Sequence, residues 1–354
     1  MYIRRIVKKA NLAVVTPESI EDLWTLRRII SQGDIISGET KRVVKEKKEF
    51  ARPDKGERVR IRISVEVELI RLDSTLERLR ISGRILEASE EFIGKGDHHS
   101  LIISLGHPIA IKKKKLDAFH IHLLKSASSI DRIVIIAIDR RDAGIGSITG
   151  THLTLLPSIN SGLGGKMYSD PKSSLQSYFS QVEQALQTLH QDGVKVVIVG
   201  PGDVKRALAN FISERNVKMS KCISVVDGID VTGEDGVYTS LKSQSLQAVM
   251  QKTTLAKAEG ILHDATNRIS KDDERVAFSL KECLLASKTR AIESLLVSSK
   301  IFEKGDESQV VEVLNSVEMF GGQTLLVDDS TDVGKRVESM GGVVSLLRYP
   351  IPVR

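Results

Sequence analysis

The sequence predicts a multidomain α/β protein, with a β-rich first section followed by two sections in which strands and helices alternate. The chain has 354 residues, which is too many for one typical hydrophobic core. Strict period-two alternation of apolar and polar residues marks the first third of the chain. Continuous apolar runs, typical of strands buried on both faces, alternate with amphipathic helices afterwards. We therefore expect domains at 1–128, 129–252 and 253–354.

The first section is expected to be a small barrel or sandwich. Apolar side chains alternate with polar ones from Val59 to Leu69 and again from Leu79 to Ile85, which predicts two strands with one buried face. Shorter strands follow around Leu101–Ser104 and Ile109–Ile111. One helix interrupts the strands, with Thr16-Pro17 expected to begin it and Gly33 to end it.

The second section predicts a largely parallel sheet covered by helices. Ile133–Ile138 and Val194–Val199 are apolar runs of the kind found in buried strands. Between them we expect a hairpin over Ile145–Leu156 that turns at Gly150. The stripe that runs from Leu175 to Leu189 predicts an amphipathic helix.

The third section predicts a second α/β unit. A long helix is expected from Leu255 to about Arg268, and a second helix over about Glu274–Leu285. Helices and strand-like runs then alternate to the end, with strands expected at Leu295–Val297, Thr324–Val327 and Val343–Leu347.

The composition of the chain limits which cellular compartment and which class of partner we expect. No run of about 18 apolar residues occurs and no signal peptide is readable at the N-terminus, so we expect a cytoplasmic protein without a membrane partner. Two cysteines exclude a disulfide framework. The net charge is +6, and the stretch Lys41–Arg62 alone holds ten Lys/Arg against four Asp/Glu. This excess favours a polyanionic partner, with a solvated charged face as the alternative.

Motifs in all three sections, in register, resemble the Pelota family. Its N-terminal pattern is matched by Glu21–Trp24, Gly33-Asp34, Arg42 with Lys45, Val65–Glu68, Leu79–Ile85 and Gly96–Leu101. Gly200-Pro201-Gly202 resembles the helix-opening turn of the central domain. Gly341–Ile351 is similar to the terminal signature that Pelota shares with class-1 release factors.

The resemblance implies an architecture and a function. It implies an N-terminal Sm-like β-barrel domain, a central domain like the release-factor middle domain, and a C-terminal domain like the kink-turn-binding ribosomal proteins. The family acts as a tRNA mimic that recognises stalled ribosomes with a vacant decoding site, and promotes ribosome rescue, subunit dissociation and mRNA surveillance (no-go decay). The implied partners are the ribosome with its mRNA and rRNA, a GTP-bound elongation factor of the aminoacyl-tRNA-delivering type, and an ABC-family recycling ATPase. A monomer suits this role.

The basic stretch supplies the RNA-binding candidates, because Lys and Arg contact phosphates without regard to sequence. On a Pelota-like N-terminal domain this stretch would reach the decoding centre. The candidates are Lys41, Arg42, Lys45, Lys47, Lys48, Arg52, Lys55 and Arg58.

The central section supplies the partner-binding candidates Lys166, Gly200, Pro201 and Gly202. Gly165-Lys166 is not a nucleotide-binding P-loop, because Asn160 and Met167 occupy the positions that need Gly and Ser/Thr. We therefore expect no intrinsic cofactor, with GTP brought by the partner GTPase. The glycines of the Gly200-Pro201-Gly202 turn also serve the backbone, so both interpretations stay open there.

Two enzymatic alternatives can be weighed against this binding role. A divalent-metal-dependent endoribonuclease would need clustered carboxylates, and Glu18, Glu21 and Asp22 form the nearest cluster, although first-turn carboxylates also stabilise a helix N-terminus. No metal-ligand set is assigned. His120 and His122 are expected to share one face of an extended segment, and these two and the histidines near His98 are interpreted as structural or surface residues.

A peptide-release factor would use a Gly-Gly-Gln loop in its central domain. Gly321-Gly322-Gln323 lies instead in the last section, between an expected helix and an expected strand. Two glycines at that place are typical of a helix C-cap and a tight connection, so we do not expect peptide release.

Overall fold

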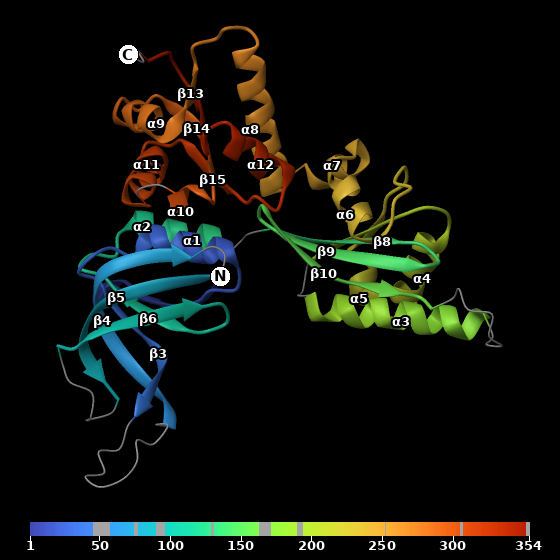
Figure 1. Cartoon of the computed structure of the whole chain (residues 1–354), viewed down its shortest axis with the longest axis horizontal. Coiled ribbons are helices and arrows are strands. Elements are labelled where there is room, and N and C mark those ends of the chain that lie inside the picture. The colour runs from blue at the N-terminus through green and yellow to red at the C-terminus, as the bar shows by residue number, and fades with distance from the viewer. Residues whose placement is uncertain are drawn as a thin grey trace.

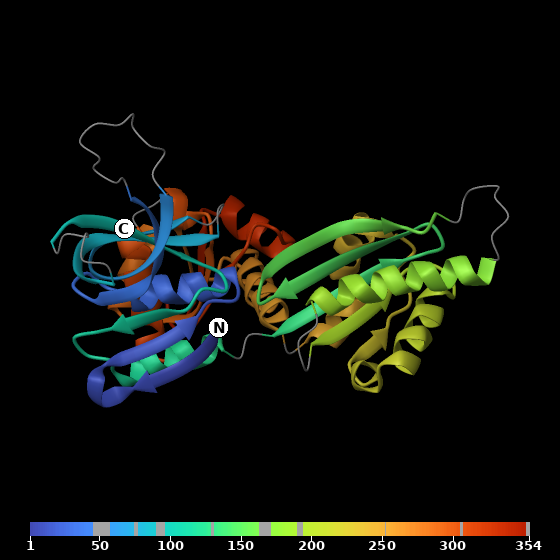
Figure 2. The same ribbon diagram turned by 90° about the horizontal axis from the view of Figure 1, so that it is seen from below.

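Three β-sheets follow one another along the chain, each with its own helices (Figures 1 and 2). The computed structural model describes residues 1–44, 57–73, 77–89, 96–128, 131–162, 171–189, 194–251, 253–304 and 307–351. We call the elements of the three sheets the N-terminal unit, the central unit and the C-terminal unit. No helix in these ranges is long and apolar enough to cross a membrane.

The N-terminal unit is a seven-stranded sheet with two helices. Its strands are β1 (Tyr2–Val7), β2 (Leu12–Thr16), β3 (Ile35–Val44), β4 (Glu57–Asp73), β5 (Arg78–Ala88), β6 (His98–Ser104) and β7 (Ile109–Lys112), and its helices are α1 (Ile20–Ile29), α2 (Ala118–Ala127) and the 3₁₀ turn Lys8–Ala10. The strand order is β1-β2-β7-β3-β4-β5-β6, and the pairings of the described residues do not join β6 to β1. The sheet is therefore open rather than a closed barrel.

The long strand β4 confirms the period-two prediction as far as Val67, whereas Leu69, beyond a register shift against β5, is 50% exposed and departs from it. Ile61, Ile63, Val65 and Val67 are almost completely buried, whereas the intervening Arg62 and Glu66 are exposed. At its far end, the Leu72 backbone N–H donates to Glu307 Oε1 of the C-terminal unit over 3.3 Å. One strand thus runs from the basic stretch to a second unit of the protein.

The central unit has a five-stranded sheet in the order β10-β9-β8-β11-β12. Its elements are β8 (Arg132–Ile138), β9 (Asp142–Thr149), β10 (His152–Asn160), β11 (Lys195–Val199), β12 (Ile223–Val225), α3 (Pro171–Leu189), α4 (Val204–Arg215), α5 (Val217–Ser220), α6 (Gly233–Leu241) and α7 (Gln244–Met250). Strands β8, β11 and β12 are parallel, and the hairpin β9–β10 is antiparallel to them. Alternate residues of β8 face α3 and α4 on one side and α6 and α7 on the other.

The C-terminal unit has a four-stranded sheet in the order β13-β16-β14-β15. Its elements are α8 (Thr254–Ile269), β13 (Val276–Phe278), α9 (Ser279–Lys288), β14 (Ile292–Ser298), α10 (Ile301–Lys304), α11 (Glu307–Met319), β15 (Gln323–Val327), α12 (Asp332–Ser339) and β16 (Val343–Leu347). Leu295 and Val297 of β14 face α9 and α11, and Leu296 between them faces α8 and α12.

Three local predictions were wrong. Helix α1 begins at Ile20, not at Thr16-Pro17, because the Asp22 carboxylate accepts the Ser19 backbone N–H over 3.2 Å and fixes the first turn there. The helix expected over Glu274–Leu285 starts only at Ser279, since Val276–Phe278 pairs with β16. His120 and His122 lie on helix α2 rather than on an extended segment, and a spacing of two residues does not place them on one helical face.

The apolar cores connect neighbouring units. One buried cluster contains residues of the N-terminal unit together with the α9–α11 side of the C-terminal unit. A second contains the α6–α7 side of the central unit and the α8–α12 side of the C-terminal unit. No cluster among the described residues contains side chains of both the N-terminal and central units. These two units must therefore meet through other contacts.

Candidate functional site

The RNA-binding candidates lie at the β3–β4 end of the N-terminal unit. Lys41 and Arg42 belong to β3 and Arg58 to β4, with Lys41 opposite Arg60 and Val43 opposite Arg58 in the antiparallel register. Lys45, Lys47, Lys48, Arg52 and Lys55 lie outside the described residues. The paired strands therefore bring basic positions of both arms of this connection side by side.

Further basic residues extend this region. Arg60 and Arg62 on β4 and Arg80 on β5 are exposed on the outward face of the sheet. Arg60 also lines a hollow of about 320 Å³ whose other walls come from β3, β6 and the start of β7 with the connection before it. None of the three was among the candidates, although the alternation that predicted β4 already placed Arg60 and Arg62 on its outward face.

The carboxylates proposed for the endoribonuclease alternative have structural partners. Asp22 is buried, with Oδ2 2.7 Å from the Met1 amino group, and it accepts the Glu18 backbone N–H at 2.7 Å. Burial raises the pKa of Asp22. The charge of the adjacent amino group opposes this rise without cancelling it. Glu18 Oε2 lies 3.5 Å from the same amino group. These two carboxylates thus hold the Met1 amino group against the start of α1.

Glu21 points away from that pair and lies at the meeting point of all three units. Only 8% of the residue is exposed, and burial raises its pKa to about 7. Its Oε1 accepts the backbone N–H of His152, in the central unit, over 3.2 Å. Within the ranges that the structure describes, no group of three or more His, Cys, Asp or Glu side chains could hold a metal ion.

The turn Gly200-Pro201-Gly202 connects β11 to α4, as expected. Gly200 has φ +132°, and a Cβ there would lie 2.1 Å from the Ile138 carbonyl oxygen, so the backbone requires glycine. Lys205 Nζ donates to the Gly200 carbonyl over 2.7 Å and lies 2.9 Å from Asp227 Oδ1. These contacts support the structural interpretation of the turn. Its proposed contact with a partner stays a prediction. Lys166 lies outside the described residues.

Gly321-Gly322-Gln323 forms the expected connection between α11 and β15. The Gly322 N–H donates to the Val317 carbonyl over 2.9 Å, and Gly321 adopts φ +74°, as in a helix C-cap. Gln323 is the first residue of β15 and pairs with Ser294 of β14. The structural interpretation of this tripeptide is confirmed.

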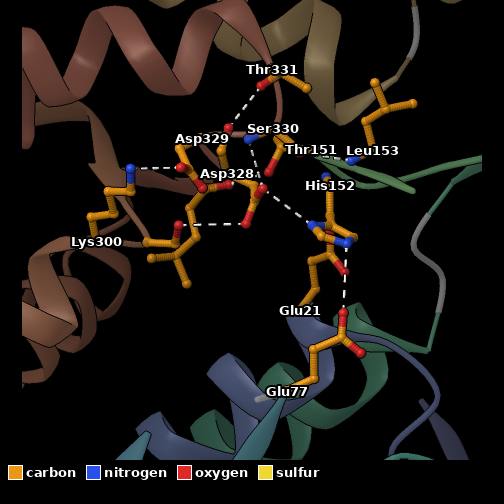
Figure 3. A network of polar contacts seen from close by, with 12 residues as sticks. Glu21, Glu77, Thr151, His152, Leu153, Lys300, Asp328, Asp329, Ser330 and Thr331 are labelled. Atoms are coloured by element: carbon orange, nitrogen blue, oxygen red, sulfur yellow. Dashed lines mark hydrogen bonds and ion pairs between the residues drawn. The ribbon is translucent and has the colours of Figure 1, made fainter. Parts of the chain in front are cut away.

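The tip of hairpin β9–β10 makes the junction between the three units (Figure 3). Thr151 Oγ1 donates to the Leu326 carbonyl over 2.8 Å, and the Leu153 N–H donates to Ser330 Oγ over 2.9 Å, so the tip is bonded to the C-terminal unit. Between them, the His152 N–H bonds Glu21 of the N-terminal unit. Three consecutive residues thus alternate between two neighbouring units.

The His152 ring lies among carboxylates from both neighbours. Its Nδ1 is 3.1 Å from Asp328 Oδ1 and its Nε2 is 3.8 Å from Glu77 Oε1 (Figure 3). Burial lowers the pKa of His152, but the bond to Asp328 and the charges of Asp328, Glu21 and Glu77 outweigh it, and the net shift is upward. The bond to His152 lowers the pKa of Asp328 although burial opposes this. No local sequence pattern predicts this cluster, because its members come from distant parts of the chain.

Family models match both ends of the chain. The Pelota N-terminal domain matches residues 2–128 and domain 3 of the release factor eRF1 matches residues 255–351. The pelota homolog of Nitrosopumilus maritimus is 42% identical over 96% of this chain and 97% of its own length. That of Cenarchaeum symbiosum is 34% identical over 95% of this chain and 96% of its own length.

Solved structures agree with these relatives. The crystal structure of Thermoplasma acidophilum Pelota has a TM-score of 0.63 at 25% identity, covering 99% of this chain and all of the other. The crystal structure of Archaeoglobus fulgidus Pelota, described as revealing inter-domain structural plasticity, has a TM-score of 0.50 at 26% identity over the full length of both chains. With a relative 42% identical over nearly its whole length, this chain belongs to the Pelota family.

Proposed function

We propose that this protein recognises stalled ribosomes with a vacant decoding site as a tRNA mimic, and promotes ribosome rescue, subunit dissociation and mRNA surveillance by no-go decay. Membership of the Pelota family carries this proposal. It fits a protein whose basic residues gather on one end of an antiparallel sheet, while the carboxylates of α1 serve structural contacts.

The proposal assigns the RNA contact to the end of the N-terminal unit. Phosphates of mRNA and rRNA would meet Lys41, Arg42 and Arg58 together with the part of the basic stretch outside the described residues, joined by Arg60 and Arg62 on the outward face of β4. Contacts of this kind read charge rather than base sequence, which suits a factor that must act on any message. We further propose that this sheet corresponds to an Sm-like module.

The other two units carry the partners in this proposal. The domains 129–252 and 253–354 bind a GTP-bound elongation factor of the aminoacyl-tRNA-delivering type and an ABC-family recycling ATPase. The turn Gly200-Pro201-Gly202 and Lys166 are the proposed contacts of the central domain. GTP enters with the partner, since the Gly165-Lys166 pair lacks the rest of a P-loop.

The decisive experiment is co-sedimentation with ribosomes stalled on a truncated message, compared with ribosomes whose decoding site holds a tRNA. We expect binding to the vacant ribosomes alone. The double variant Arg60→Glu/Arg62→Glu should weaken binding at least about tenfold and flatten its salt dependence, because each lost phosphate contact reduces the salt slope by about one.

A matched control reverses the same amount of charge elsewhere. Lys218 and Lys221 are exposed on the central unit, and Lys218→Glu/Lys221→Glu should leave binding unchanged. Equal binding to vacant and occupied ribosomes would overturn the proposed function. Equal loss in the two double variants would overturn the assignment of the RNA contact. The partner assignment fails if gel filtration with a non-hydrolysable GTP analogue yields no complex with the GTPase.

A further inference from the structure

A cavity of about 540 Å³ lies where the three units meet. Most of its wall comes from α1 and α2 of the N-terminal unit and from α8, the end of α11 and β15 of the C-terminal unit. The tip of hairpin β9–β10 adds Gly150 and Thr151, and the neighbouring Leu153 is buried in the apolar cluster that the central and C-terminal units share. The volume lies in the range of small-molecule sites, which form preferentially where domains meet.

The inner wall of this cavity carries two buried polar groups that lack partners. Glu21 uses Oε1 to accept the His152 N–H, but Oε2 has no hydrogen-bond partner among the described residues. Trp24 Nε1 also lacks one in the same part of the chain. Both residues line the cavity, and residues three apart lie on the same face of a helix. Helix α1 therefore presents an acceptor and a donor to the cavity, and leaving either unpaired when buried is unfavourable.

The outer wall is polar and carries one uncompensated positive charge. Arg28 and Glu318 also line the cavity, but they neutralise each other at 3.0 Å. Lys257, His122 and Gln323 have no side-chain hydrogen bond or ion pair among the described residues, and all three are exposed, so they lie where the cavity opens to solvent. The glycines that precede Gln323 are explained by the backbone, whereas the amide of Gln323 is still free to bind a ligand.

This arrangement fits a ligand with two different ends. A nucleobase carries an N–H donor next to an acceptor on its Watson–Crick edge, which complements the Glu21 carboxylate oxygen and the Trp24 indole N–H. A phosphate group complements the Lys257 ammonium at the opening. Inorganic phosphate would leave the inner pair unsatisfied, and an uncharged base would leave Lys257 without a counter-ion. A mononucleotide satisfies both walls.

We propose that this cavity binds a nucleoside monophosphate. The edge of its base bonds Glu21 Oε2 and Trp24 Nε1, and its phosphate lies beside Lys257 and His122. Glu21 and Trp24 are therefore binding residues in this chain, in addition to the contact that Glu21 makes with His152. The site belongs to the free protein, so it stands or falls independently of ribosome binding.

The test is isothermal titration calorimetry of the full-length protein with the monophosphates of adenosine, guanosine, cytidine and uridine in turn. At least one should bind saturably, with a dissociation constant below about 1 mM. Trp24 is the single tryptophan, so its fluorescence, corrected for light absorbed by the nucleotide, should change over the same concentration range and place the ligand in this cavity. Inorganic phosphate alone should bind at least about tenfold more weakly, because it cannot bond the inner pair.

Glu21→Gln should weaken nucleotide binding at least about tenfold, because it replaces the unpartnered oxygen by an amino group that cannot accept a hydrogen bond. Glu312→Gln is the matched control, since Glu312 is exposed on α11 and does not line the cavity. This variant should bind the nucleotide as the unaltered protein does. Circular dichroism establishes that each variant is folded.

Lys257→Ala provides a second variant at an exposed position, where folding does not depend on the side chain. It should weaken nucleotide binding about threefold to tenfold, whereas Lys281→Ala, which removes an exposed positive charge from α9, should not. Absence of saturable binding by all four nucleotides up to about 10 mM would overturn the site. Binding that leaves Trp24 fluorescence unchanged, or that is as tight for inorganic phosphate as for the nucleotide, would overturn it as well.

Discussion

Two contacts of the N-terminal unit differ in what holds them together. Towards the C-terminal unit, α1 and β4 pack on α11 and α10 with a shared apolar cluster and two ion pairs, Arg27–Glu307 at 2.6 Å and Arg28–Glu318 at 3.0 Å. Towards the central unit, the contact is a hairpin tip bonded through Glu21 and His152. The first contact combines burial with pairing, and the second is polar with unsatisfied atoms at its edge.

The difference indicates which of the two contacts of the N-terminal unit opens more readily. Apolar burial is lost all at once when two surfaces part, whereas polar groups at a small contact are compensated by water as they separate. The central unit nevertheless shares its own apolar cluster with the C-terminal unit, so the contrast concerns the two contacts of the N-terminal unit alone. The following changes would break or sharpen this contrast, in order of decreasing effect.

Glu307→Gln should have the largest effect, because it leaves the Arg27 guanidinium, whose side chain is 8% exposed, without its counter-ion. Removing one partner of a buried pair costs about 3–5 kcal/mol, and the partial exposure of Glu307 puts our expectation at about 3 kcal/mol. The change in the free energy of unfolding can be measured by urea unfolding. The fluorescence of Trp24 reports on it, because Trp24 is the single tryptophan and a buried residue of α1.

Its control is Glu293→Gln, which removes a charge 3.6 Å from Arg268 at a more exposed pair. This change should cost less than about 1 kcal/mol. Equal shifts of the unfolding midpoint in both variants would contradict the idea that the contact between the N-terminal and C-terminal units is the rigid one.

The pH dependence of closure tests the other contact. The pKa of Glu21 is about 7 when the hairpin is seated and falls towards its ordinary value of 4.5 when water reaches it, so the closed form binds the extra proton. The contribution of Glu21 to closure is therefore fully present below about pH 4.5 and is lost as the pH rises to about 7. At about 1.4 kcal/mol per pKa unit, this contribution is up to about 3 kcal/mol.

His152, whose pKa is raised in the closed form, acts in the same direction above its ordinary value of 6.5. Asp328, whose pKa is lowered, weakens closure only as the pH falls below 3.8. The fraction of protein in which this contact is open, measured by double electron–electron resonance between spin labels at Glu87→Cys and Glu214→Cys, should rise between pH 5 and pH 8. Glu21→Gln should flatten this rise, and an unchanged profile in that variant would exclude Glu21 as the proton-binding group.

Gly150→Ala should also open the junction, by about 2 kcal/mol, since the residue would keep a left-handed backbone and meet the Glu21 carboxylate. Gly162 offers a comparison with a similar φ of +67° and no atom within 4 Å. Gly162→Ala should reproduce the backbone cost without moving the label distances. The same distance change in both variants would mean that the approach to Glu21 is unimportant.

Lys300→Ala should have the smallest effect. Lys300 Nζ lies 2.7 Å from Asp329 Oδ2, but both side chains are about 40% exposed. An exposed pair contributes at most about 1 kcal/mol, so the ratio of open to closed contact should change by less than about fivefold. A change of more than about tenfold in the ratio of open to closed contact would show that the whole loop after β15, rather than His152, holds the hairpin tip.

The strands were predictable where a periodic pattern and a buried face coincide. The alternation along β4 and the continuous apolar runs of β8 and β11 follow from the fold itself and are visible in the sequence. Strand β13 was mistaken for the start of a helix because three residues carry too little pattern, and its pairing with β16 decides it. Pairing across about 70 residues leaves no local trace.

The junction could not be predicted for the same reason. The turn at Gly150 was expected, but its neighbours Glu21, Glu77 and Asp328 come from distant parts of the chain. Glu21 was assigned to a helix terminus or a catalytic cluster because its position next to Asp22 in the sequence suggests one site. In the structure the two carboxylates serve different contacts, since successive residues of a helix point in directions about 100° apart.

Strand β4 has a mechanical consequence. Its 17 residues run from the basic end of the N-terminal unit past two register shifts against β5 to Leu72, whose amide is bonded to α11. At about 3.3 Å per residue this is a lever of roughly 50 Å. A force applied where β4 leaves the basic stretch passes first along its pairing with β3 and then along its pairing with β5 to Glu307, the same residue that pairs with Arg27.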